Sequence, residues 1–216
     1  MLYDDDNREA EIDFVLPSVL ITSQHIARMR EDAGGLICCA LPYQLAEAID
    51  LPYLADLYDS VGENYAVIAK MRDHQLPYGA KSAFSASVNH VDNFTGITDW
   101  ERAKTVNTVG QLTQEYASGQ STDMIDKFGS SFRIPGHVPL LIAREGLLAE
   151  RQGHTELGLT LCQFLDYPMS TTICEMMSSK TNKAVTMDEA EFYSKKMNFP
   201  LIEGRQLIEL WNERID

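Results

Sequence analysis

The sequence contains no apolar run approaching the roughly 18 residues of a membrane-spanning helix, and its first residues are acidic, whereas a secretory signal begins with basic ones. Cysteine is scarce: the chain has Cys38, Cys39, Cys162 and Cys174, with no CxxC spacing. Adjacent cysteines make a poor zinc chelate and rarely form a disulfide. These absences predict a soluble cytoplasmic protein with reduced thiols and no membrane partner.

Positive charge is also in short supply. The chain has 18 lysines and arginines against 32 aspartates and glutamates, which gives a formal net charge of −14. A surface of this sign repels a phosphate backbone, so we expect no nucleic-acid partner. An anionic metabolite would need local arginines, a helix N-terminus or a bound cation to offset the overall field. The nucleotide and zinc signatures GxGxxG, GxxxxGK[ST] and HExxH are absent as well.

The chain is long enough for one large domain, with 216 residues of which 44% are hydrophobic. No repeat or flexible linker divides it. Strands are expected at 35–41, 83–90, 138–143 and 171–177, helices at 23–32, 43–49, 65–72, 98–116, 157–165, 187–197 and 204–214, and a polar loop at 118–131. The sequence therefore predicts a single α+β domain over residues 1–216, with a mixed β-sheet packed between helices.

Local signals mark several element boundaries. The capping boxes Thr98 with Glu101 and Thr186 with Glu189 predict two helix starts, and Ser23 is the expected N-cap of the first helix. In the stretch FRIPGHVPLLIA at 132–143, the dipeptide at 135–136 predicts a turn. Pro139 within the following strand predicts an edge or a bulged position.

The most acidic segment is DDDNREAEIDF at 4–14. If 9–14 is extended, its period of two places Glu9, Glu11 and Asp13 on one face and three apolar residues on the other. Three carboxylates on a half-buried strand repel one another and need protons or a cation. A solvated acidic N-terminus is the alternative, although a disordered tail has no reason to alternate.

The segment RQGHTE at 151–156 is the second candidate site. A glycine turn at a helix start leaves backbone N–H groups pointing outward, which with Arg151 suits a phosphate. The neighbouring His154 could ligate a metal or move a proton. An ordinary capped helix with an incidental histidine is the alternative.

Three further positions could take part in a reaction, and each also has an ordinary structural explanation. His137 follows a Pro-Gly dipeptide, with Arg133 four residues earlier, and could simply be solvated. Glu175 is a single carboxylate in an apolar strand, a costly placement unless it is paired or reaches water. Cys38 and Cys39 lie in a core-like strand, where inert packing is the default. Together these signals suit a small phosphorylated polyol bound through a divalent cation.

With these residues assembled, the chain resembles the 3,4-dihydroxy-2-butanone 4-phosphate synthase family of riboflavin biosynthesis, in its monofunctional archaeal form. The resemblance covers nearly the whole chain. It rests on the stretches DDDNREAEID, DAGGLICCAL, FTGITDWERA, PGHVPLL, RQGHTE and TTICEMM.

The resemblance implies a function and an assembly. Members convert ribulose 5-phosphate to 3,4-dihydroxy-2-butanone 4-phosphate and formate with Mg²⁺, for which Mn²⁺ is an expected substitute, and without an organic cofactor. They are homodimers whose sites form where the subunits meet. The GTP cyclohydrolase II domain of some bacterial fusions has no counterpart here, so a single activity is expected.

The resemblance also implies residue roles. Glu9 and His154 would be the magnesium ligands, and His137 and Glu175 would take part in proton transfer. Glu11 and Cys38 match further active-site positions. The expected substrate contacts are Arg8, Glu9, Asp13, Thr95, Arg151, Gln152, Gly153, His154, Thr155 and Glu175.

Two departures from the family pattern stand out. Residues 1–3 alone precede the acidic motif, so the first strand is expected to be clipped or to start upstream. RIPGHV replaces the bacterial RPGHV, which leaves Arg133 without a carried-over role.

Other functions stay open. A catalytically silent sugar-phosphate-binding protein and another magnesium-dependent sugar-phosphate aldolase or isomerase are the alternatives. The carbamoyltransferases of similar fold would need a basic surface, and the net charge of −14 argues against them.

Overall fold

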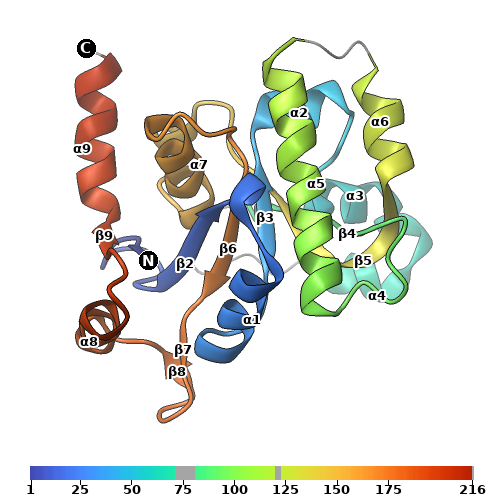
Figure 1. Cartoon of the computed structure of the whole chain (residues 1–216). Coiled ribbons are helices and arrows are strands. Elements are labelled where there is room, and N and C mark those ends of the chain that lie inside the picture. Colours follow the sequence, from blue (N-terminus) through green and yellow to red (C-terminus); the bar gives the residue numbers. More distant parts are fainter. Residues whose placement is uncertain (72–80, 120–122, 216) are drawn as a thin grey trace.

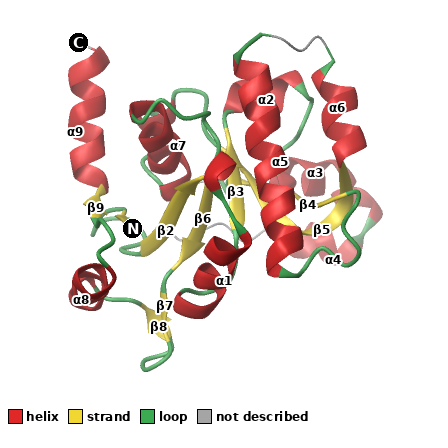
Figure 2. Cartoon of the chain, in the orientation of Figure 1, coloured by secondary structure: helices red, strands yellow, loops and turns green. Residues whose placement is uncertain are grey.

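The computed structural model describes residues 1–71, 81–119 and 123–215. A mixed sheet with the strand order β4-β5-β3-β6-β2-β1-β9 forms its centre, and helices lie against both faces (Figures 1 and 2). The strands of this sheet are β1 Leu2–Tyr3, β2 Ile12–Pro17, β3 Cys38–Leu41, β4 Phe84–His90, β5 Phe132–Ile142, β6 Thr171–Glu175 and β9 Ile202–Glu203. A separate two-stranded sheet pairs β7 (Met177–Ser178) with β8 (Lys183–Ala184). The predicted α+β class and mixed sheet are confirmed.

The helices follow most of the expected segments. They are α1 Ser23–Asp32, α2 Tyr43–Ala48, α3 Leu54–Val61, α4 Ala66–Met71, α5 Asp99–Ala117, α6 Met124–Ser131, α7 His154–Phe164, α8 Met187–Met197 and α9 Gly204–Ile215. Short 3-10 turns occur at Ser18–Leu20, Gly62–Asn64 and Leu147–Ala149. Residue 72, expected at the end of a helix, lies outside the described residues. No described helix has the length and apolarity needed to cross a bilayer.

The adjacent cysteines show how the layers are arranged. Successive side chains of a strand point to opposite faces, so Cys38 and Cys39 of β3 lie on opposite sides of the sheet. Cys39 packs in the larger core, to which α1, α2, α5 and α6 contribute. Cys38 packs with Leu159 of α7 in a smaller cluster on the other side. The inert packing expected of these thiols agrees with their burial.

Helix α7 lies very close to the sheet. A Cβ atom on Gly158 would be 2.7 Å from Thr171 Cγ2 of β6 and 3.3 Å from Val15 Cγ1 of β2. A side chain here would therefore push the helix away from the strands. On its other side α7 packs against α9, the outermost helix in Figure 1.

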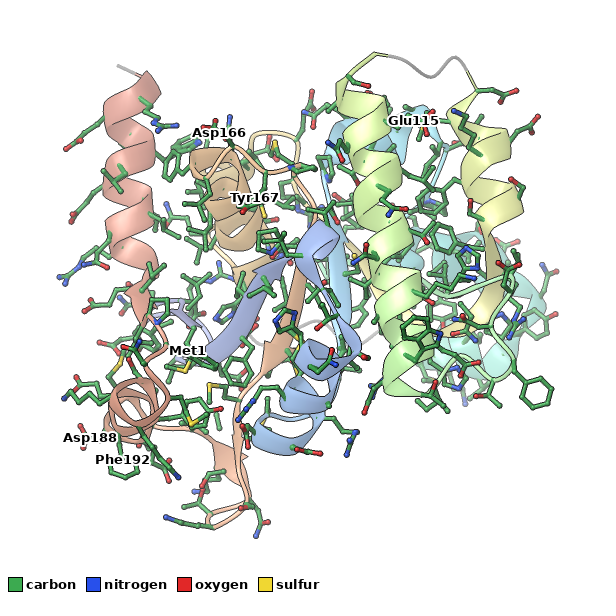
Figure 3. All side chains as sticks on the ribbon, in the orientation of Figure 1. Met1, Glu115, Asp166, Tyr167, Asp188 and Phe192 are labelled. Carbon is green, nitrogen blue, oxygen red and sulfur yellow. The ribbon has the colours of Figure 1, made fainter. Side chains whose placement is uncertain are left out.

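The C-terminal helices cover the β1–β9 end of the sheet. In α8 the buried Ala190 faces the core, whereas Asp188 and Phe192 project outward (Figure 3). Thr186 and Glu189 form the predicted capping box of this helix, and Thr98 and Glu101 form that of α5.

Two predictions about helices are wrong. Residues 124–131, expected as a polar loop, form α6, because Asp123 accepts a hydrogen bond from the Asp126 N–H group and the apolar Met124 and Phe128, one turn apart, become buried. The N-cap of α1 is Thr22 rather than Ser23: its hydroxyl accepts from the His25 N–H group, and His25 Nδ1 accepts from the Thr22 N–H group.

The prolines of β5 lie inside the sheet. β5 runs through the expected turn and pairs with β4 on one side and β3 on the other, so the predicted edge position is wrong. The predicted irregularity is correct, since the pairing with β4 shifts register twice. Val88 pairs with Val138 and the next residue, Asn89, with Arg133, so residues 134–137 bulge out of the pairing.

The expected alternation over residues 9–14 holds only in part. Ala10 has a φ of +52°, so the extended chain begins later and β2 starts at Ile12. From there β2 runs antiparallel to both β1 and β6. Residues 4–11 form the loop that joins β1 to β2, and this loop carries the first candidate site.

Candidate active site

An open pocket lies where β2, β3, β5 and β6 meet the start of α7. It encloses about 550 Å³, including the part open to solvent. Its lining residues are Glu9, Asp13, Cys38, Ser82, Ala83, Phe84, Leu141, Arg151, His154, Thr155, Ile173 and Glu175. The pocket therefore unites the acidic segment, the RQGHTE segment and the carboxylate of β6.

Asp4 holds the acidic loop in shape. Its side chain is 2% exposed, and its two carboxylate oxygens accept hydrogen bonds of 3.1 Å from the N–H groups of Glu9 and Glu11. Arg8 Nε lies 3.7 Å from the same carboxylate. Asp4 does not stand out in the sequence, because its partners are backbone groups that carry no sequence signal.

His154, the first residue of α7, meets two of the expected acidic residues. Its Nδ1 lies 3.6 Å from Glu9 Oε2 and 3.6 Å from Asp13 Oδ2. His154 is buried, and its Nε2 has no hydrogen-bond partner among the described residues. The buried Asp13 Oδ1 is likewise unpartnered there. Buried polar atoms without a partner are rare and call for one, here an ion or a ligand.

The electrostatics of these groups show an excess of negative charge. Burial raises the pKa of Asp13 to about 8 against the attraction of His154, and the carboxylates of Glu175, Glu11 and Glu9 add to the rise. Burial alone would lower the pKa of His154, but Asp13 and a hydrogen bond to Glu9 outweigh it and raise the pKa to about 9. Protons thus occupy a site that a cation could neutralise instead.

A metal ion fits this arrangement. One ligand atom each from Asp4, Glu9 and His154 lie within 4.8 Å of one another. Carboxylate oxygens with a single imidazole, and open positions left for water and substrate, suit Mg²⁺ or Mn²⁺ better than a closed structural zinc site. Glu9 and His154, the expected ligands, are brought together, and Asp4 joins them.

An anion site borders the carboxylates. A Cβ on Gly153 would lie 3.0 Å from Arg8 Nη2 and 3.1 Å from Arg151 Cζ, so both guanidinium groups lie beside this glycine. Gly153 is the N-cap of α7 and provides no side-chain acceptor, which leaves N–H groups of the first turn for a ligand. Nε of Arg8 and Nε of Arg151 are buried without a hydrogen-bond partner among the described residues. Such a site suits a phosphate group.

A buried carboxylate keeps Arg151 in place. Arg151 Nη1 lies 3.2 Å from Oε2 of Glu156, whose side chain is fully buried. Glu156 also accepts a 3.1 Å hydrogen bond from the Arg144 N–H group. Thr155 lines the pocket, whereas Gln152 lines the adjoining hollow and donates to the Leu148 carbonyl.

Glu175 and Cys38 line the pocket on neighbouring strands. Asp13 pairs with Glu175 across β2 and β6, so two carboxylates lie side by side. Burial raises the pKa of the Cys38 thiol, which keeps it protonated and unreactive. Glu11 does not line the pocket, although burial and the charge of Glu9 raise its pKa.

Two of the expected site residues lie in another part of the sheet, away from the pocket. Thr95 and His137 belong to a second cluster, at the β4–β5 end of the sheet, where Asn89 contacts both of them. Arg133 donates to the carbonyls of Val91 and Phe94 and so supports the loop before Thr95. A single chain therefore divides the expected residues between two places.

The second cluster is bordered by exposed apolar side chains. Phe94 is 93% exposed, Trp100 72% and Ile134 71%. Large apolar groups exposed together are unusual on a monomer and mark a surface that another molecule covers.

Comparison with known proteins identifies the relatives of this chain. A family model described as 3,4-dihydroxy-2-butanone 4-phosphate synthase matches residues 1–210. Curated proteins of that name are similar: one from Methanosarcina mazei is 41% identical, over 97% of this chain and 84% of its own, and one from Archaeoglobus fulgidus is 39% identical, over 97% and 87%.

Solved structures share the fold. A synthase of the same name from Candida albicans has a TM-score of 0.72 at 24% identity, covering 97% of this chain and 88% of its own. Another, in complex with two magnesium ions, has a TM-score of 0.73 at 24% identity, covering 98% and 89%.

Proposed function

This chain belongs to the 3,4-dihydroxy-2-butanone 4-phosphate synthase family, and from that premise we propose that it converts D-ribulose 5-phosphate into L-3,4-dihydroxy-2-butanone 4-phosphate and formate. The observation that carries the proposal is the convergence of Glu9 and Asp13 on His154 beside Arg151. One pocket thus combines a cation site with an anion site, as a phosphorylated sugar bound through a metal requires.

The phosphate end of the substrate is assigned to the start of α7. Arg8 and Arg151 provide positive charge beside Gly153, and the first turn of the helix provides N–H donors. Thr155 adds a hydroxyl group to the same wall. These groups offset the unfavourable field of a chain with a net charge of −14.

The sugar end is assigned to the carboxylates. Glu9 and His154, with Asp4 nearby, would hold a magnesium ion, for which manganese is the proposed substitute. When bound, the ion supplies Lewis acidity toward the ketose oxygens. Glu175 and Asp13 are placed to hold or move protons at the sugar carbons and hydroxyls.

His137 and Thr95 are assigned to the same reaction through a second copy of the chain. Neither lines the pocket of its own chain, and the exposed apolar groups Phe94, Trp100 and Ile134 border their cluster. A homodimer that covers this apolar surface could bring His137 of one subunit to the pocket of the other. We propose such a dimer, acting in the cytoplasm.

Formate release tests the reaction. Purified protein is incubated with ribulose 5-phosphate and Mg²⁺, and a parallel sample contains EDTA. We expect formate only in the presence of the metal. Absence of formate from a folded dimer would instead support a silent binding protein, and conversion of the sugar phosphate without formate would support another aldolase or isomerase.

Mixed dimers test the sharing of sites. Glu9→Ala and His137→Ala chains carry different affinity tags, are co-expressed, and are purified through both tags. If the sites are shared, one site of each mixed dimer keeps both residues, and the inactive parents together regain about half of the wild-type activity per dimer. No recovery in a mixed dimer would contradict the shared site.

A further inference from the structure

Asn89 occupies the centre of the second cluster. It is the penultimate residue of β4, and its side chain is 3% exposed. Its amide contacts two segments that the proposed function requires: the Thr95 loop and the bulge of β5 that carries His137.

Two glycines make room for this residue. A Cβ on Gly96, which has a φ of +88°, would lie 2.2 Å from Cγ of Asn89. A Cβ on Gly136 would lie 1.9 Å from the carbonyl carbon of Val88 and 2.3 Å from the backbone nitrogen of Asn89. The glycines of the TGIT and PGH segments thus both allow close approach to residue 89.

Backbone partners of fixed polarity determine the orientation of the amide. The His137 N–H group donates to Asn89 Oδ1 at 2.9 Å, and Asn89 Nδ2 donates to the Thr95 carbonyl at 3.2 Å. Neither contact is satisfied if the oxygen and nitrogen are exchanged, because an N–H group would then face a donor and a carbonyl would face an acceptor.

The amide orientation in turn selects a form of the imidazole. His137 Nδ1 lies 3.1 Å from Asn89 Nδ2 and 3.3 Å from Oδ1. One of the two Nδ2 hydrogens of Asn89 is donated to the Thr95 carbonyl. The second has a hydrogen-bond partner if His137 Nδ1 is an acceptor. A proton on Nδ1 could instead donate to Oδ1, which already accepts from the His137 N–H group, but it would leave the second Nδ2 hydrogen facing a donor, at a cost of about 1–3 kcal/mol.

We propose that Asn89 is the positioning residue of His137: its amide donates to Nδ1 and holds the neutral imidazole with its proton on Nε2, the nitrogen left for proton transfer. Among the described residues His137 Nε2 has no hydrogen bond, and His137 is exposed. The same amide ties Thr95 to His137, so both are presented as one unit. The importance of this unit for the reaction rests on the proposed function.

The tautomer can be measured directly. Wild-type protein labelled with ¹⁵N-histidine is studied by long-range ¹H–¹⁵N NMR at mildly alkaline pH. The His137 signals are assigned by their loss in His137→Gln. We expect Nδ1 to show the shift of an unprotonated nitrogen and Nε2 that of a protonated one.

Asn89→Asp tests the cause of this preference. The carboxylate is nearly isosteric but can only accept, so we expect the proton to move to Nδ1. Asn93→Asp is the matched control, because Asn93 is similarly buried and donates to the Glu101 carbonyl and to Thr105 Oγ1. This control should leave the His137 tautomer unchanged.

Several outcomes would overturn the proposal. They are a wild-type His137 with its proton on Nδ1, an Asn89→Asp protein with an unchanged tautomer, and an Asn93→Asp protein that shows the same switch. If Asn89→Asp does not fold, the wild-type spectrum alone still decides.

Kinetics connect the tautomer to the reaction. In Asn89→Asp we expect kcat to fall about 10- to 100-fold, as is typical when the partner that orients a functional histidine is lost, with a smaller change in KM. Unchanged kcat with a switched tautomer would contradict the role. A wild-type protein that releases no formate would remove the proposed reaction, yet the NMR result on Asn89 would stand independently.

Discussion

Buried neighbours hold two of the charged groups of the pocket, Glu9 and Arg151, in place. Asp4 shapes the loop that presents Glu9, and Glu156 holds Arg151. Such partners limit the movement of the side chains that meet the ligand, which is what a site needs to bind without reorganisation.

His154 is the residue whose loss should be most damaging. Loss of a residue that only orients a metal ligand typically weakens metal binding about 10- to 100-fold. His154→Ala removes a ligand itself, so we expect it to weaken Mg²⁺ or Mn²⁺ binding by more than this. Calorimetry with Mn²⁺ measures the affinity, and formate release measures the activity. The second candidate histidine, His137, provides the control, since His137→Ala should keep the metal affinity. Normal turnover by His154→Ala would refute the metal assignment.

Arg151 should act on binding more than on chemistry. Loss of hydrogen bonds between charged groups costs about 1.5–3 kcal/mol, so Arg151→Ala should raise KM by about 10- to 150-fold and change kcat less. Steady-state kinetics with ribulose 5-phosphate provide the measurement. An unchanged KM would remove Arg151 from the phosphate site.

Among single residues, the sequence predicts those whose type is unusual for their local pattern. Glu9, Asp13 and His154 stood out as carboxylates in a half-apolar pattern and a histidine at a glycine turn. Asp4, Glu156 and Asn89 did not stand out, because each acts on backbone groups or on residues brought near by folding. Their types and spacing resemble those of ordinary polar residues.

At the scale of elements, helix α5 carries an anchor for the Thr95 loop. Glu101 accepts hydrogen bonds from the side chain of Thr95, at 2.9 Å, and from the N–H groups of Thr95 and Gly96, each at 3.0 Å, besides those of its capping partner Thr98. Burial would raise its pKa, but these bonds outweigh it and lower the pKa of Glu101 to about 2. The carboxylate thus joins the helix to the loop.

This carboxylate should make stability sensitive to acid. Because its folded pKa lies below the ordinary value of 4.5, its stabilising contribution is complete above about pH 4.5 and disappears as the pH falls toward 2. Glu101→Gln should be less stable than wild type at pH 7, and the difference should shrink toward pH 2. Urea denaturation over this pH range measures both proteins. A constant difference would show that the charge of Glu101 is not responsible.

Elements were predictable where their signals are local. The capping boxes of α5 and α8 require four consecutive residues, and both helices begin where these residues indicate. Helix α6 was missed because it is short and has only two buried residues, Met124 and Phe128, which find their partners in the tertiary core. Pro139 indicated an irregularity in β5, but the place of the bulge, at residues 134–137, depends on close contact with β4.

At the scale of the whole molecule, the division of the expected site is the observation behind the proposed dimer. The pocket and the His137 cluster lie in different parts of the sheet, and the exposed apolar groups accompany the cluster. From the sequence, the overall class followed from alternating strand and helix periods. The separation of the two halves could not be foreseen, because it depends on the path of β4 and β5 in three dimensions.

Trp100→Glu should therefore dissociate the proposed dimer. A charge at this 72% exposed position opposes burial against a second apolar surface, while the fold of one chain is unaffected. Light scattering coupled to size exclusion measures the mass, and circular dichroism checks the fold. Phe192→Glu, on the outer face of α8 in Figure 3 and 69% exposed, is the control and should remain dimeric. A Trp100→Glu protein of unchanged mass would place the interface elsewhere.

The short distance between α7 and the sheet also affects the candidate site. Gly158 touches no expected ligand, yet it determines how far the helix stands from β2 and β6, and the first turn of that helix carries His154 and the anion-binding N–H groups. A larger residue at 158 would move His154 and these N–H groups together, away from the carboxylates of β2 and β6. The span between the proposed phosphate site and the strand carboxylates is therefore set by a residue that lines neither of them.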